Sequence, residues 1–141
     1  MSDLFNLVRF IEAQDPVYAR VCSELRQGRK VSHWMWFVFP QIAGLGYSSI
    51  SREYAISGQA EARAYLAHPI LGPRLVECAQ ILATKAGSSA VDIFGPVDAM
   101  KLHSSMTLFA SVAEPEEGVF REVLDQFFGG VEDEATTSRF E

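Results

Sequence analysis

The chain has 141 residues, of which 48% are hydrophobic and 21% charged, and its formal net charge at pH 7 is -6. This size suits one globular domain, and the apolar composition excludes a disordered or fibrous chain. The sequence has no apolar run of ~18 residues that could span a membrane, and its first residues, MSDLFNLVRF, lack the basic region of a signal peptide. We therefore expect a cytoplasmic protein with no membrane partner.

Two helices are predicted at the N-terminal end. In residues 3–13 the apolar side chains recur at the spacing of an amphipathic helix. The Asp15-Pro16 pair starts a second helix over residues 16–27, because proline is favoured at the first helical position, and Gly28 ends it. We expect these two helices to form an antiparallel pair.

A third, aromatic-rich helix is expected over residues 33–38, because Ser32 can act as its N-cap and Pro40 must end it. A loop that contains Gly44 and Gly46 follows. Apolar spacing, proline starts and glycine stops then predict helical segments over residues 49–55, 58–68, 69–85, 90–94, 96–112 and 115–128. Because no run alternates β-branched and polar residues, we expect a single compact all-α domain of seven or eight helices.

The negative charge is concentrated at the C-terminal end. Residues 114–141 carry nine acids and two bases, whereas the preceding 113 residues carry nine acids and ten bases. We therefore divide the chain into a helical domain over residues 1–130 and an acidic tail over residues 131–141. The acidity disfavours nucleic acid as a partner. A small basic cluster lacks the interleaved exposed aromatics of a nucleic-acid site; it consists of Arg20, Arg26, Arg29 and Lys30.

The sequence offers no recognisable cofactor or metal motif. Cys22 and Cys78 form no Cys-x-x-Cys motif, so we interpret them as reduced thiols in the core. The three histidines include no His-Glu-x-x-His motif, and we expect no metal site. Gly44-Leu45-Gly46 lacks the third glycine of a dinucleotide-binding loop, and the Gly-x-Ser-x-Gly nucleophile motif is absent. We therefore expect no cofactor.

The first block with chemical potential is SHWMWFVFPQ, residues 32–41, which contains both tryptophans of the chain. Its aromatic side chains are distributed around the whole helix. A helix that is apolar on every face is usually central to a core. Alternatively, Trp34 or Trp36 lines a pocket in which a ring stacks, and His33 and Gln41 supply polar contacts.

The second block is FGPVDAMKLHSSMTLF, residues 94–109. On a helix, Lys101, Ser104 and Ser105 share one face, with Asp98 one turn before Lys101. In a structural interpretation, the serines bond back to helix carbonyls and Asp98 pairs with Lys101. In a functional interpretation, the lysine and the two hydroxyls converge on an anionic or carbonyl group of a ligand.

Four ordered blocks, RFIEAQ, SHWMWFVFPQ followed by GLGYSSISREYAI, EARAYLAHPILGPRL and IFGPVDAMKLHSSMTLF, together span nearly the whole chain. They resemble the signature blocks of a bacterial domain-of-unknown-function family whose members are often labelled calpastatin. The resemblance implies a compact all-helical fold of the right-handed superhelical type, and it implies no activity. Calpain inhibitors called calpastatin are long, disordered and polar, unlike this apolar chain. The family often ends in an Asp-x-x-Thr-Leu turn, which is looser here at Asp133.

These observations support two hypotheses about function, beside a structural interpretation in which all the blocks are core. The first is that the protein binds, with or without turnover, a small metabolite with an aromatic ring and an anionic group. Arg9 and Lys101 would compensate the charge, and His33 or His103 would act as acid or base. The alternative is a non-catalytic protein-interaction module. The candidate ligand-binding residues are His33, Trp34, Trp36, Gln41, Lys101, His103, Ser104 and Ser105.

Overall fold

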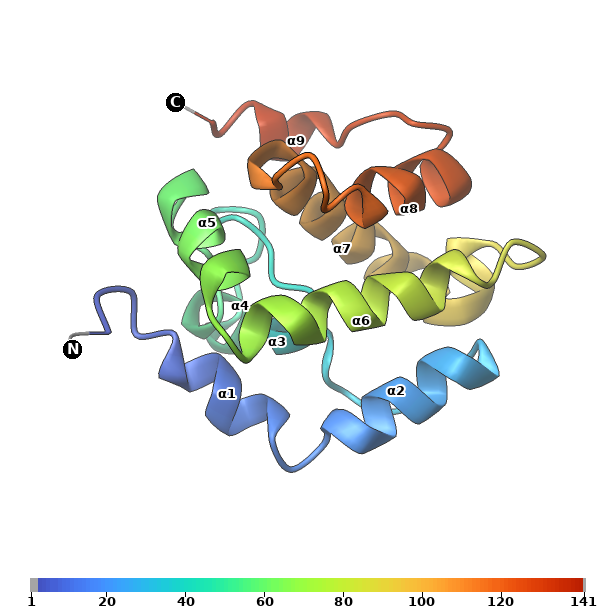
Figure 1. Ribbon diagram of the computed structural model, residues 1–141, viewed down its shortest axis with the longest axis horizontal. Coiled ribbons are helices and arrows are strands. Elements are labelled where there is room, and N and C mark those ends of the chain that lie inside the picture. The colour runs from blue at the N-terminus through green and yellow to red at the C-terminus, as the bar shows by residue number, and fades with distance from the viewer. Residues whose placement is uncertain (1–2, 141) are drawn as a thin grey trace.

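The computed structural model describes residues 3–140, and every regular element among them is an α-helix (Figure 1). The helices are α1 (Val8–Gln14), α2 (Tyr18–Gln27), α3 (Met35–Val38), α4 (Ser49–Glu53), α5 (Gln59–Ala67), α6 (Leu71–Ala83), α7 (Ala90–Val112), α8 (Val119–Phe128) and α9 (Glu134–Thr137). The all-α prediction is confirmed. The expected count of seven or eight helices is too low for residues 3–140, because the segment expected to be an acidic tail contains the four-residue helix α9.

Helices α5 to α8 form the centre of the fold, since α5 and α8 both pack against α6 and α7. Around this centre, α2 packs against α6, α9 against α7, and α1 against α3. In Figure 1, α6 crosses the middle of the molecule, with α1 and α2 on one side and α8 and α9 on the other. The contacts among α5 to α8 thus form a closed set rather than a linear stack.

The first helix begins later than its apolar spacing predicts. Asn6 has a left-handed φ of 54°, and the Asp3 carboxylate accepts hydrogen bonds from the N–H groups of Leu7 and Val8 at 2.7 and 2.9 Å. The residues before α1 therefore form a capped turn. The expected antiparallel α1–α2 pair is wrong, because the two helices pack mainly against different partners, α3 and α6.

Some local start and stop signals lie where the sequence predicts them, and others do not. Helices α2 and α8 begin at Tyr18 and Val119, later than the expected residues 16 and 115. Ser32 is not the N-cap of α3, because its hydroxyl donates to the Glu24 carboxylate, and Trp34 takes that position. Gly28 ends α2 with a left-handed φ of 75°. At the start of α7, the Ser89 hydroxyl accepts from the Asp92 N–H at 3.0 Å, and the Asp92 carboxylate accepts from the Ser89 N–H at 3.1 Å. Gly95, with a φ of 80°, interrupts α7 before Pro96, so the helix consists of a short and a long segment. The long segment carries the second block.

Candidate ligand-binding cleft

A cleft with a volume of about 360 Å³ lies between α7 and the loop that joins α3 to α4. Its lining consists of Gln41, Leu45, Gly46, Ser51, Val97, Met100, Lys101, His103, Ser104, Asp133 and Ala135. A smaller hollow of about 130 Å³ shares Gln41, Gly46 and Ser51 with the cleft. Ligand pockets commonly measure about 300–1,000 Å³, so the cleft has the size of a small-molecule site.

The cleft brings together four of the predicted site residues. Lys101, His103 and Ser104 lie on α7, and Gln41 faces them from the loop. Trp36 lines the adjoining hollow. On α7 the polar residues alternate with apolar ones, and the side chains of Val97 and Met100 are 65% and 71% exposed. The cleft is therefore amphipathic.

Lys101 is only partly neutralised by its neighbours. Its Nζ lies 3.7 Å from the Asp98 carboxylate, which also pairs with Lys30 Nζ at the shorter distance of 2.9 Å. Two ammonium groups thus share one carboxylate. Lys101 Nζ also lies 4.8 Å from the centroid of the Trp36 ring, within the range of a cation–π interaction. This arrangement holds a cation at the edge of the cleft.

Asp133 closes the other side of the cleft. One of its carboxylate oxygens, Oδ2, accepts hydrogen bonds from the hydroxyls of Ser104 at 2.7 Å and Thr136 at 2.6 Å, and its N–H donates to the Thr107 hydroxyl at 2.9 Å. Thr136 is completely buried. The Asp133-x-x-Thr136 turn is thus formed, and it attaches residues 131–140 to α7. Ser104 already has a partner in the protein, so its hydroxyl is less available to a ligand.

His103 is held in place on both sides of its ring. Its Nε2 lies 2.7 Å from the carbonyl oxygen of Val131, and its ring stacks on Phe128 at a centroid distance of 4.3 Å. Because a carbonyl oxygen only accepts, Nε2 must carry a proton. The other ring nitrogen, Nδ1, is an acceptor when the imidazole is neutral. His103 therefore has a fixed orientation, and its Nδ1 forms no hydrogen bond within residues 3–140.

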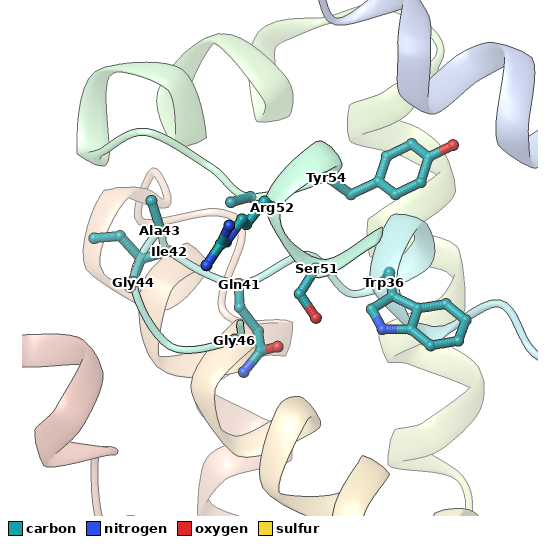
Figure 2. A pocket seen from close by; sticks show the side chains of 10 residues that line it. Trp36, Gln41, Ile42, Ala43, Gly44, Gly46, Ser51, Arg52 and Tyr54 are labelled. Carbon is teal, nitrogen blue, oxygen red and sulfur yellow. The ribbon is translucent and has the colours of Figure 1, made fainter. Parts of the chain in front are cut away.

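The lining of the smaller hollow combines apolar and glycine residues with side chains that carry N–H donors (Figure 2). The Trp36 indole N–H, the Gln41 amide and the Arg52 guanidinium have no hydrogen-bond partner among residues 3–140. The indole nitrogen of Trp36 lies on the side of its ring that faces Ser51. A group that enters this hollow therefore meets N–H donors.

Three predicted site residues lie outside the cleft and the hollow. His33 is exposed on the segment before α3. Trp34 is only 1% exposed, and its ring packs near the rings of Phe39 and Phe94 at centroid distances of 6.2 and 6.4 Å. Ser105 is completely buried, and its hydroxyl has no hydrogen-bond partner among residues 3–140. Stacking on Trp34 and a ligand contact at Ser105 are thus not available in this structure.

Arg9 also has a structural role rather than the expected charge-compensating one. Its guanidinium pairs with the buried Glu61 carboxylate at 3.0 Å. The guanidinium also donates to the main-chain carbonyls of Phe5 and Asn6, before α1, and to those of Glu53 and Ala55, around the end of α4. With its donors used in this way, Arg9 joins the N-terminal turn to the segment before α5.

Glu24, which the sequence analysis did not single out, positions the whole aromatic block. Its carboxylate accepts hydrogen bonds from the N–H groups of Val31 and Ser32, from the Ser32 hydroxyl and from Trp34 Nε1, at 2.6 to 3.0 Å. Burial by itself would raise the pKa of this carboxyl. The hydrogen bonds from Ser32, Val31 and Trp34 outweigh burial and lower the pKa to about 2. Glu24 thus holds the chain that leads into α3.

Sequence reasoning also missed three residues around the cleft. Ser51 and Arg52 lie on α4, and no periodic pattern connects this short helix to α7. Asp133 lies in the segment that we expected to be an acidic tail. The Asp133-x-x-Thr136 spacing was the available signal, since a carboxylate and a hydroxyl three residues apart can bond within one turn.

Comparison with known proteins places the chain in a family. The family described as "Protein of unknown function (DUF1810)" matches residues 4–140. The chain belongs to the DUF1810 family. The crystal structure of the conserved hypothetical protein Rv1873 from Mycobacterium tuberculosis is similar to it, with a TM-score of 0.95 and 50% sequence identity over 98% of each chain. None of the curated proteins matches the chain.

These relationships support the expected membership of a domain-of-unknown-function family, and neither match bears the calpastatin label. In the described part of the chain, no helix has the length and apolar character that crossing a membrane requires. Residues 3–140 also contain no group of three or more histidine, cysteine or acidic side chains placed to hold a metal ion. The expected cytoplasmic location and the absence of a cofactor stay predictions.

Proposed function

We propose that this DUF1810 protein binds a small metabolite with an anionic group and an apolar or aromatic body in the cleft between α7 and the loop that joins α3 to α4. The observation that carries the proposal is the position of Lys101. Lys101 lines the cleft, and its Nζ lies 3.7 Å from the Asp98 carboxylate. Lys30 Nζ pairs with the same carboxylate at the shorter distance of 2.9 Å. An anionic ligand would complete the charge balance there.

The apolar wall of the cleft supports the second part of the proposal. Val97 and Met100 expose most of their side chains, and Leu45 faces them from the loop. Exposed apolar groups that border a concave polar site gain free energy when a ligand covers them, by about 25 cal/mol for each Å² of apolar surface removed from water. A ligand with both a charged and an apolar part therefore uses the cleft better than a simple ion.

A more specific version of this proposal is that the protein also transforms the ligand chemically. His103 is the imidazole of the cleft, and Nδ1 stays available because Nε2 bonds to the Val131 carbonyl. A fixed imidazole next to a bound ligand suits general acid–base chemistry. Binding without turnover uses the same contacts, so the proposal rests on binding.

A screen for thermal stabilisation tests the proposal. The compounds are nucleotides, dinucleotides, phosphosugars and aromatic acids, and the proteins are the wild type, Lys101→Met and Arg20→Met. Methionine keeps an unbranched side chain of similar length but removes the charged Nζ that lies over Trp36, and Arg20 is an exposed control on α2. A ligand at a hundred times its Kd should stabilise the wild type by about 2.7 kcal/mol.

We expect compounds of the proposed class to stabilise the wild type and Arg20→Met but not Lys101→Met. The proposal is refuted if no anionic compound with an apolar or aromatic body stabilises the wild type. Equal stabilisation of Lys101→Met would remove Lys101 from the site.

A second candidate function, docking of a partner protein, is favoured by the exposure of Val97 and Met100 on one face of α7. An apolar side chain of the partner would cover them. The right-handed superhelical arrangement, which would offer a concave surface to such a partner, stays a prediction. Loss of partner binding in Met100→Gln, with ligand stabilisation unchanged in Lys101→Met, would favour this candidate.

A further inference from the structure

The glycine loop at residues 44–46 is flanked by two arginine side chains that have no acidic partner in the described chain. Arg52 lines the smaller hollow, and Arg139 lies against Gly44, where an added Cβ would come within 2.5 Å of Nη1. Neither guanidinium forms an ion pair among residues 3–140. No acidic residue lines the smaller hollow within the described residues. Positive charge is therefore available on both sides of the loop.

The main chain of the loop adds further donors. The N–H groups of Gly44, Leu45 and Gly46 have no hydrogen-bond partner among residues 3–140, whereas the N–H of Ala43 donates to the Ile56 carbonyl at 2.8 Å. That bond fixes the start of the loop. Successive free N–H groups in a turn form a concave site for an anion, and arginine binds phosphate oxygens in a fixed planar geometry.

Glycine is required at both ends of this loop. Gly44 has a φ of 99°, in the left-handed region that favours glycine. At Gly46, a Cβ would lie 2.6 Å from the Cβ of Ser51, so only a glycine lets the loop approach α4 so closely. The Gly-Leu-Gly sequence thus has a geometric reason, even though it does not form a dinucleotide-binding motif.

The size of the hollow limits what can enter. Its volume of about 130 Å³ is below the ~300 Å³ at which sites for whole small-molecule ligands begin, so it suits one small group of a ligand, such as a phosphate. Because the hollow shares Gln41, Gly46 and Ser51 with the larger cleft, one ligand can extend from one space into the other.

We infer that the 44–46 loop and Arg52 form a phosphate subsite, with Arg139 adding charge from the far side of Gly44. This inference deepens and rests on the proposed function. It narrows the ligand class to phosphate esters whose apolar body lies in the cleft and whose second anionic group pairs with Lys101. In Figure 2 the Arg52 guanidinium and the Gln41 side chain both lie beside the loop that carries Gly44 and Gly46.

Titration of the ¹⁵N-labelled protein with inorganic phosphate, at an ionic strength matched with sodium chloride, tests the subsite without requiring the complete ligand. We expect the amide resonances of residues 44–46 to shift and saturate in the wild type and in the control Arg20→Met. In Arg52→Met, phosphate affinity should fall about tenfold or more, because a charged hydrogen-bond donor is lost. The indole N–H of Trp34, buried against Glu24, is an internal reference that should not move.

The inference is overturned if phosphate causes no saturable shift in the wild type, or if Arg52→Met binds phosphate as tightly as the wild type. Arg52 is exposed, so its replacement leaves the core intact. Lys101→Met separates this result from the proposed function. Phosphate binding that survives in Lys101→Met, without any Lys101-dependent ligand in the thermal screen, supports the subsite and refutes the larger proposal. A Lys101-dependent ligand in the thermal screen, without saturable phosphate binding at residues 44–46, supports the proposed function and refutes the phosphate subsite.

Discussion

Replacement of Glu24 by glutamine should lower the free energy of unfolding near neutral pH. In acid, the variant and the wild type should be equally stable. The carboxylate of Glu24 accepts four hydrogen bonds, three of them at Oε1 and one at Oε2. In Glu24→Gln, the amide oxygen can keep the three bonds, and the Ser32 hydroxyl can rotate to accept from the new NH₂ group. The variant thus removes the negative charge with little change in shape, and its neighbours keep their partners.

The expected magnitude follows from the pKa of Glu24, which falls from an ordinary value of 4.5 to about 2 in the folded protein. A difference of that size corresponds to about 3 kcal/mol of stability above the unfolded-state pKa. Because the folded-state pKa is the lower one, this stability is lost as the pH falls from about 4.5 through about 2, and about 2 kcal/mol of it is gone at pH ~3. Glu24→Gln has no carboxyl to titrate at this position.

Urea unfolding followed by circular dichroism, at several pH values between neutrality and the acid limit of the fold, measures this difference. The wild type should exceed Glu24→Gln by about 3 kcal/mol near neutral pH, and the two should converge in acid. Glu12→Gln is a matched control, because Glu12 is exposed on α1. Equal stabilities of the wild type and Glu24→Gln at pH 7, or a gap that does not narrow in acid, would refute the reasoning.

Three further substitutions test other parts of the structure. Ser105→Ala should stabilise the protein by about 1 kcal/mol in urea unfolding, because it removes a buried hydroxyl that lacks a partner among residues 3–140; a loss of stability would show that the hydroxyl is bonded. Asp133→Ala should cost about 1–3 kcal/mol, because the buried Thr136 hydroxyl loses its acceptor. Its hydrogen exchange should rise over residues 131–140, and unchanged exchange would contradict the anchoring role. Gly46→Ala should cost about 1–3 kcal/mol, because its Cβ would lie 2.6 Å from the Cβ of Ser51. Calorimetry should therefore find a lower melting temperature for Gly46→Ala than for the wild type. Equal melting temperatures would show that the loop can move away from Ser51 without cost.

Helix α7 carries both side chains that line the cleft and side chains of the core. Met100 and Lys101 reach the cleft, whereas Leu102, Ser105 and Met106 on the same helix are buried. The structural interpretation of this block is partly confirmed, and the functional one stays a prediction. Ser104 bonds back to the Met100 carbonyl at 3.2 Å, as the structural interpretation expects, and it lines the cleft as well.

The sequence by itself determined the class of the fold and many of its boundaries. Gly28, the Ser89 cap and the Gly95-Pro96 break are local signals, because a cap or a left-handed turn depends on residues three or four positions away. Such signals operate wherever the segment lies in the fold. The shared face of Lys101 and Ser104 was visible for the same reason, since helical geometry alone sets it.

Only the tertiary structure decided which members of the aromatic block are buried. Trp34 is the N-cap residue of the four-residue helix α3 and Trp36 lies within it. This helix is too short for periodicity to distinguish an inner from an outer face. Glu24, ten residues before Trp34, selects the buried one by accepting its indole N–H. The extent to which Asp98 neutralises Lys101 likewise depends on Lys30, which pairs with the same carboxylate. Lys30 is distant in sequence and reaches Asp98 only after α2 and α7 have packed into the same core. Which side chains are buried, and which charges are paired, depends on contacts between residues far apart in the sequence. These contacts form only when the helices pack together.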